Sequence, residues 1–244
     1  MLVAGIDINQ FFIDFLNVDW SVIGEYKDLF IRGFFMTILL SVVGICVGLM
    51  IGLLLSLMRI SGKKWLDFPA KVYVDLFRGT PLLLQIYVIH FAFLPTLTMD
   101  LLGANESPSG MVSGFVALSL NAGAYIAEIS RGGIQSIDKG QMEAARSLGM
   151  TYGQAMRHVI LPQAFKRSLP PLGNEFISLT KDSSLVAVLA VNDITYAAFT
   201  TAKNTLEKWA PYLTVGLMYL VLTFILSRII FYLEKRFSVN LSKR

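Results

Sequence analysis

Four long stretches of the chain carry no charged side chain. They cover residues 33–58, 79–99, 107–127 and 209–227, and they are 26, 21, 21 and 19 residues long. A helix needs about 20 predominantly apolar residues to cross a bilayer. The pattern therefore predicts an all-α membrane protein in which these four stretches form transmembrane helices. The composition agrees, because 16% of the residues are charged, against about 25% in soluble domains.

The second stretch belongs to a longer apolar segment that is too long for one straight span. Residues 66–97 would extend about 48 Å at a helical rise of about 1.5 Å per residue, whereas the hydrocarbon core is about 30 Å thick. Four charged residues of alternating sign, at spacings of four, four and three, begin this segment: Asp67, Lys71, Asp75 and Arg78. Such spacing places them on one helical face. We therefore predict an interfacial or cytoplasmic helix over 66–77, followed by a span that opens at Pro81.

Small residues recur every four positions in the first stretch, at Gly44, Gly48, Gly52 and Ser56. In a membrane, small side chains allow two helix backbones to approach closely and so mark helix–helix contacts. We expect this stripe to pack within one subunit. A contact between two subunits is the alternative.

The distribution of basic residues predicts which side of the membrane each loop occupies, because short cytoplasmic loops are enriched in Lys and Arg. Residues 1–32 hold two basic and five acidic residues, residues 59–78 hold five basic residues, and residues 100–106 hold two acidic and no basic residues. Residues 128–167 hold six basic and three acidic residues, and the tail after residue 227 holds five and one. In chain order, these five segments are therefore expected outside, inside, outside, inside and inside the cell.

Two successive cytoplasmic segments require a further crossing between them. This crossing must lie within 168–202, where the charged residues Glu175, Lys181 and Asp182 interrupt the apolar pattern. We thus expect five transmembrane helices, with the N-terminus outside and the C-terminus in the cytoplasm. The expected organisation is an external segment over 1–30, a transmembrane domain over 31–233 with a cytoplasmic loop over 128–167, and a basic cytoplasmic tail over 234–244.

Several kinds of chemistry are missing from the sequence. It has no Gly-x4-Gly-Lys-[Ser/Thr] loop for nucleotide phosphates and no zinc-protease or serine-hydrolase motif. With Cys46 as the one cysteine and His90 and His158 as the two histidines, no His/Cys metal cluster forms. We expect no catalytic residue, no metal, no cofactor bound by this chain and no nucleic-acid partner.

The loop over 128–167 has a regular internal pattern. Asp138-Lys139-Gly140 breaks the chain, residues 141–148 favour a helix, and Gly149 suits its C-terminal cap. We expect a second short helix over about 151–160 that ends before Leu161-Pro162. Two short helices outside the membrane suit a docking surface, and an amphipathic hairpin lying on the bilayer is an equal alternative on these residues.

This loop resembles the EAA loop of permease subunits of ATP-binding-cassette (ABC) importers. Glu143-Ala144-Ala145, Gly149 and Val159-Ile160-Leu161-Pro162 match that pattern at every spacing, with Val159 in place of an Ile. Three further motifs are similar to the polar amino acid branch of the family: Arg78-Gly79-Thr80-Pro81-Leu82-Leu83 with Gln85, Tyr125-x-x-Glu128-x-x-Arg131-Gly132-Gly133-Ile134, and Leu172-Gly173-Asn174-Glu175-Phe176. Asp138 departs from the family, which often has Pro there.

The resemblance implies a type I ABC importer permease (MetI-like) fold in a bacterial inner membrane and a role in importing polar amino acids. It implies a dimer of ABC ATPase subunits, which holds the ATP and Mg, a second permease subunit that is identical or related, and an external solute-binding protein. Amino acid substrate and membrane lipid complete the expected partners. The residues that the resemblance assigns to ATPase coupling are Gly140, Glu143, Ala144, Ala145, Gly149, Leu161 and Pro162.

Charged residues inside a span normally face a protein interior or an aqueous cavity, and they mark a transport pathway. Glu175, Ser178 and Asp182 share one helical face, with Lys181 one step around and Ser183 next along the chain. We expect these five residues to line the substrate pathway, although a structural, internally paired set is the alternative. Gln85, Asn121 and Tyr125 are weaker candidates from neighbouring spans.

A transporter or channel that works without ATP is the alternative function. Secondary transporters usually carry internal repeats, and we find no convincing repeat in the five spans. Co-purification with an ATPase subunit separates the two functions.

Overall fold

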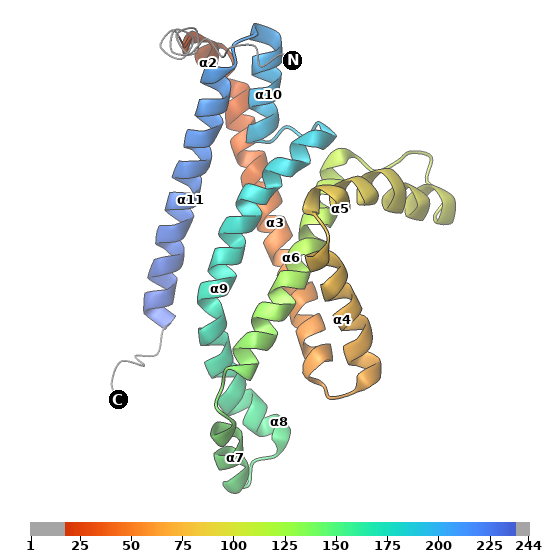
Figure 1. The fold of residues 1–244 in the computed structure, drawn as a ribbon, viewed down its shortest axis with the longest axis vertical. Coiled ribbons are helices and arrows are strands. Elements are labelled where there is room, and N and C mark those ends of the chain that lie inside the picture. Colours follow the sequence, from red (N-terminus) through yellow and green to blue (C-terminus); the bar gives the residue numbers. More distant parts are fainter. Residues whose placement is uncertain (1–17, 238–244) are drawn as a thin grey trace, which may run out of the picture.

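The computed structural model describes residues 18–237, and these residues form a helical bundle (Figure 1). The helices are α2 Ser21–Glu25, α3 Lys27–Ile60, α4 Lys64–Gly79, α5 Leu82–Val88, η1 Ile89–Phe93, η2 Thr96–Leu101, α6 Gly110–Gln135, α7 Lys139–Ser147, α8 Tyr152–Ala155, η3 Met156–Ile160, α9 Leu161–Asp182, η4 Ser183–Leu189, α10 Ile194–Thr205 and α11 Trp209–Phe237. Most of the expected external segment and of the basic tail lies outside the described residues.

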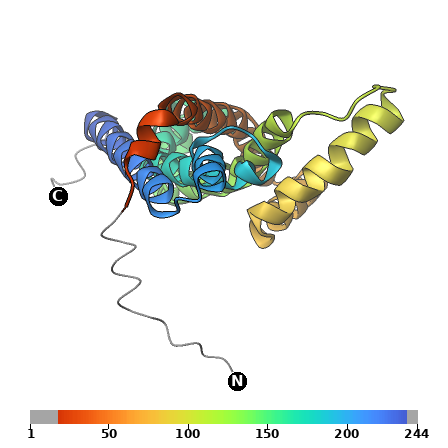
Figure 2. The ribbon, with the colours of Figure 1, turned by 90° about the horizontal axis from the view of Figure 1, so that it is seen from above.

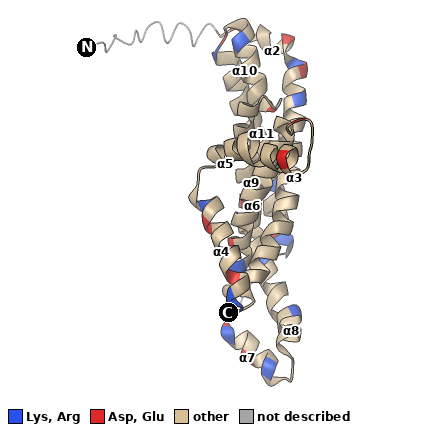
Figure 3. Cartoon of the chain, turned by 90° about the vertical axis from the view of Figure 1, so that its right-hand side faces the viewer, with Lys and Arg blue, Asp and Glu red and all other residues tan. Residues whose placement is uncertain are grey.

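Four helices are long and apolar enough to cross a membrane, over residues 27–60, 82–101, 110–135 and 209–236. These helices cover all of the first and fourth predicted stretches and most of the other two, so this part of the prediction is confirmed. A fifth candidate span is broken, with residues 152–189 and 194–205 meeting at 45°. Charged side chains gather mainly towards the two ends of the bundle (Figure 3).

The small-residue stripe of α3 packs on α6 within the chain. A Cβ atom added at Gly48 would lie 2.7 Å from Cβ of Ala122, and one added at Gly52 would lie 2.6 Å from Cγ2 of Ile126. The prediction of packing within one subunit is therefore confirmed for these positions. Because the contacting residue numbers rise together, α3 and α6 run in the same direction, as the predicted alternation of sides requires.

The segment between α3 and α6 bends more sharply than the sequence indicated. The predicted helix over 66–77 is present as α4, whose Ala70 and Val74 pack against α3 and α6. Pro81 then breaks the helix with extended backbone at φ −63° and ψ 135°. Residues 82–101, which we call the arm, leave the bundle crosswise to α3 instead of following it (Figures 1 and 2).

The broken span begins in the loop after α6. Helix η3 leads into α9 without the break expected before Leu161-Pro162, because Ile160 keeps helical backbone at φ −78° and ψ −55°. Pro162 lies in the first turn of α9, where it removes one backbone N–H from the helix that continues from η3. The span ends its first half at Ala190, in a left-handed conformation with φ 56°.

The second half of the broken span is anchored to its neighbours by a buried carboxylate. Oδ1 of Asp193 accepts the backbone N–H of Tyr196 at 2.7 Å and so caps α10. The hydroxyl of Tyr219 on α11 lies 3.4 Å from Oδ2 of Asp193. On α3, Oγ1 of Thr37 accepts the N–H of Ile194 at 3.2 Å. These bonds fix α10 against α3 and α11.

Candidate functional site

A helical hairpin made of α7, α8 and η3 extends α6 and α9 beyond the bundle, at the end opposite α2 and α10 (Figure 1). We call residues 137–160 the hairpin. Its first helix begins at Lys139 and not at residue 141, because Oδ1 of Asp138 accepts the N–H of Gly140 at 2.7 Å. The expected chain break at 138–140 is thus the N-terminal cap of α7.

The turn between the two helices of the hairpin depends on Gly149. Its φ is +86°, a value that side chains other than glycine rarely adopt. The N–H of Met150 bonds to the carbonyl of Ala145 at 3.2 Å, and the N–H of Gly149 bonds to that of Arg146 at 3.0 Å. These bonds form a Schellman-type cap, so the predicted role of Gly149 at the end of α7 is confirmed. Thr151 and Gln154 then form a capping box that starts α8.

The inner face of the hairpin packs on the ends of α6 and α9. Its apolar cluster is built from Ile134, Ile137, Met142, Met156, Val159, Ile160 and Ala164. Arg167 of α9 also donates to the carbonyl of Ser136 at the end of α6. The hairpin and the two helix ends therefore form one packed unit, and a force on the hairpin reaches both spans.

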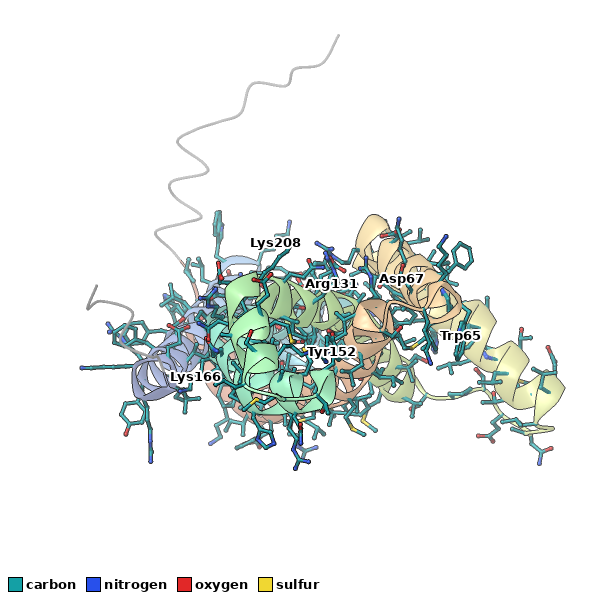
Figure 4. All side chains as sticks on the ribbon, turned by 90° about the horizontal axis from the view of Figure 1, so that it is seen from below. Trp65, Asp67, Arg131, Tyr152, Lys166 and Lys208 are labelled. Carbon is teal, nitrogen blue, oxygen red and sulfur yellow. The ribbon has the colours of Figure 1, made fainter. Side chains whose placement is uncertain are left out.

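The predicted coupling residues lie on both faces of the hairpin. Gly140, Glu143, Ala144, Gly149, Leu161 and Pro162 are exposed, whereas Ala145 is buried and belongs to the inner face. Two large apolar residues that the prediction omitted are strongly exposed, with fractions of 82% for Leu148 and 56% for Tyr152. Tyr152 lies on the underside of the molecule (Figure 4). Their position next to the turn at Gly149 could have identified these two residues from the sequence.

The predicted pathway residues of the broken span differ in their exposure. Lys181 and Asp182 are exposed, and Glu175 and Ser178 are half-buried. Ser183 is fully buried, and its hydroxyl donates to the carbonyl of Thr180 at 2.9 Å. Four of the five residues are therefore at least partly exposed on this chain, while Ser183 faces its interior.

Gln85 and Asn121 bond to each other and not to open space. Nδ2 of Asn121 donates to Oε1 of Gln85 at 2.9 Å, and Nε2 of Gln85 donates to the carbonyls of Phe77 at 2.8 Å and Thr80 at 3.0 Å. This network holds the elbow between α4 and α5 on α6. Tyr125 lies one turn further along α6 and has the guanidinium of Arg78 5.3 Å from the centre of its ring.

A cluster of ion pairs around Glu128 joins α3, α4 and α6. Arg59 of α3 donates to Oε1 of Glu128, and Arg131 donates to both carboxylate oxygens, at 3.2 and 2.6 Å. Arg78 at the end of α4 lies 3.7 Å from Oε2. Arg59 also pairs with Asp67 at 3.7 Å. Seen from below, Arg131 and Asp67 lie on neighbouring elements (Figure 4).

A family model described as "Binding-protein-dependent transport system inner membrane component" matches residues 44–239. This range includes the α3 stripe, the Glu128 cluster, the hairpin and the broken span. The chain belongs to this family. Probable glutamine ABC transporter permease protein GlnM of Bacillus subtilis (strain 168) is 43% identical over 216 residues, which cover 88% of this chain and 96% of the relative.

Solved structures support the family and define the fold. The chain superposes with a TM-score of 0.81 and 39% identity on a chain of "Crystal structure of an amino acid ABC transporter with histidines", covering 90% and 99% of the two chains. The inward-facing MetNI methionine ABC transporter gives a TM-score of 0.70 at 21% identity, covering 86% of this chain and 97% of that one. The fold is therefore MetI-like.

The chain is the permease subunit of an amino acid ABC importer, a multi-pass protein of the inner membrane. ATP hydrolysis takes place on a partner ATPase, so the alternative of a transporter or channel without ATP is excluded. The permease family also implies an external binding protein as a partner.

Proposed function

We propose that the hairpin docks on the ATPase subunits and transmits their closure into α6 and α9. The observation that carries this proposal is the two-faced packing of the hairpin. Its apolar inner face is packed on both helix ends, while Leu148, Tyr152, Glu143 and Ala144 remain exposed. A partner that presses on the outer face moves both spans, because the inner contacts leave no independent joint. The hairpin therefore works as a lever between nucleotide chemistry and the membrane.

The proposal includes an orientation in which the N-terminus is outside and the hairpin is cytoplasmic. The basic residues of 128–167 support it, and the parallel course of α3 and α6 agrees with the predicted alternation of sides. Alternating access then requires the permease to rock between inward and outward openings while the ATPase drives each change.

Cysteine labelling tests orientation and docking together. In a Cys46→Ala background, which removes the exposed native thiol of α3, Ser109→Cys is expected to react with an impermeant maleimide on intact cells. Lys139→Cys is expected to react only after the membrane is opened, and at least several-fold more slowly once the ATPase subunits are bound. Labelling of Lys139→Cys in intact cells would contradict the orientation, and unchanged labelling with bound ATPase would contradict docking at this face.

A second permease subunit, identical or related, is expected to cover the arm. Among the described residues, η2 has no buried member, and Val88, Phe91 and Leu101 are exposed at 50%, 68% and 72%. Large exposed apolar surface of this kind marks a contact with protein or membrane. The pairing implied by the family resemblance supplies that cover.

We further propose that polar amino acids pass along the exposed face of α9. Lys181 and Asp182 offer opposite charges side by side, as the two ends of a zwitterion require, and Ser178 adds a hydroxyl on the same helix. Glu175 lies close enough to interact electrostatically with both Asp182 and Arg78. This face therefore presents two carboxylates and an ammonium group on one helix.

Asp182→Asn is expected to change the KM of uptake by about 10-fold or more, because a hydrogen bond to a charged group contributes about 1.5–3 kcal/mol, and the change is expected to differ between cationic, neutral and acidic amino acids. The measurement is uptake of one amino acid of each kind into proteoliposomes that contain the complete importer. Asp28→Asn, in an exposed first turn of α3, is the matched control. Equal KM values for all three amino acids in Asp182→Asn and wild type would assign Asp182 a structural role.

A further inference from the structure

We infer that Glu128 is a positioning residue that transmits movement of the hairpin from α6 to α4 and α3. The inference rests on the proposed role of the hairpin, and it concerns how the motion continues beyond it. Glu128 accepts hydrogen bonds from Arg59 and Arg131 and pairs with Arg78. No other described carboxylate pairs with three guanidinium groups from three helices.

The input side of this connection is rigid. Glu128 and Arg131 lie in the last two turns of α6, which ends at Gln135, and Nη1 of Arg131 donates to Oε1 of Gln135 at 2.6 Å. Ile134 in the last turn and Ile137 just after it belong to the apolar cluster that the hairpin shares with α6. A shift of the hairpin therefore displaces Glu128 through less than three turns of continuous helix.

The output side reaches both neighbouring helices. Arg59 lies in the last turn of α3, and its side chain is 14% exposed. Arg78 lies in the last turn of α4, directly before the elbow at Pro81 that aims the arm. Gln85 just beyond the elbow holds Asn121 of α6. Movement of Glu128 thus acts on α4 at the point that decides the direction of the arm.

The ion pair between Glu128 and Arg78 is the contact of this cluster that is best suited to form and break during transport. Its atoms are 3.7 Å apart and the Arg78 side chain is 43% exposed, whereas Glu128 is 18% exposed. Glu128 therefore sets how strongly the end of α4 is held to α6.

The charge balance explains why the carboxylate is indispensable for this linkage. The cluster combines Arg59, Arg78 and Arg131 with Glu128 and Asp67. Without the charge of Glu128, three guanidinium groups face one carboxylate, and like charges in a poorly solvated place repel each other. The ion-pair link from α6 to the end of α4 is then lost, and the apolar contacts of Ala70 and Val74 remain as a weaker connection.

The test compares Glu128→Gln, Arg78→Gln and the double variant in proteoliposomes that contain ATPase and binding protein. We expect each single variant to lower the amount of amino acid taken up per ATP hydrolysed by at least 5-fold, and the double variant to lower it no further. Arg78→Lys is expected to restore part of the ratio, because it keeps the positive charge. Glu25→Gln, an exposed carboxylate in α2, is the control.

Uptake per ATP is the deciding readout, since a general loss of folded protein lowers uptake and hydrolysis in proportion. An unchanged ratio in both single variants, or additive losses in the double variant, would overturn the inference. If Glu128→Gln fails to reach the membrane, the comparison of Arg78→Gln with Arg78→Lys decides the inference, because the Arg78 side chain is 43% exposed and its replacement is easier to tolerate. A lever variant at Gly149 that transports normally would instead contradict the proposed function, so the two failures are distinguishable.

Discussion

Replacing Gly149 by valine is expected to abolish transport and binding-protein-stimulated ATP hydrolysis while the permease still inserts into the membrane. The φ of +86° at this position is a genuine outlier for a β-branched residue, and such strained backbone costs about 1–3 kcal/mol. The strain is relieved only if the exit of α7 rearranges. That rearrangement displaces Leu148 and Tyr152, the exposed residues on either side of the turn.

Two further substitutions make this experiment specific. Gly149→Asn is expected to retain a large part of the activity, because Asn tolerates positive φ better than other residues. Gly153→Val is the matched control, since Gly153 lies in α8 without a positive φ and nothing within 4 Å opposes a Cβ there. Uptake and stimulated ATP hydrolysis are measured in proteoliposomes. Normal values for both in Gly149→Val would remove the hairpin turn from the mechanism.

Replacing Gly48 by leucine is expected to separate α3 from α6 and so to destabilise the whole subunit. The first added carbon would already lie 2.7 Å from Cβ of Ala122 and 3.2 Å from the backbone nitrogen of Gly123, and leucine adds three more carbons. Overpacking of a close contact costs about 1–3 kcal/mol and occasionally more. We therefore expect a Tm in detergent at least several degrees below wild type, together with low recovery.

Gly216→Leu makes the same change in α11, where nothing lies within 4 Å of an added Cβ, and its Tm is expected to match wild type. The double variant Gly48→Leu with Ala122→Gly is expected to recover part of the loss, because it removes the first atom that the new side chain meets. Fluorescence-detected size-exclusion chromatography after heating measures all three variants. An unaltered melting profile of Gly48→Leu would show that α3 and α6 do not pack as described.

Local features of this permease followed directly from its sequence. The spans appear as stretches without charge because a charged side chain in hydrocarbon costs about 2.5–3.5 kcal/mol on insertion scales. The broken candidate span agrees with the fifth crossing expected from the count of sides, and the turn at Gly149 was expected because glycine accepts a positive φ most readily. The stripe at Gly44, Gly48 and Gly52 predicted a helix contact because close approach requires small side chains. Each conclusion depends on a residue and its near neighbours in sequence.

The tertiary structure decided which residues meet and in which direction segments leave the bundle. The sequence predicted that a span opens at Pro81, but only the tertiary structure shows that this span leaves the bundle crosswise to α3 (Figure 1). Ser183 read as a pathway residue, yet its position at the start of η4 turns it inward. Glu128 meets Arg59 across 69 positions of sequence. Such pairings depend on the register between helices, which close packing of distant side chains sets, and no local pattern encodes that register.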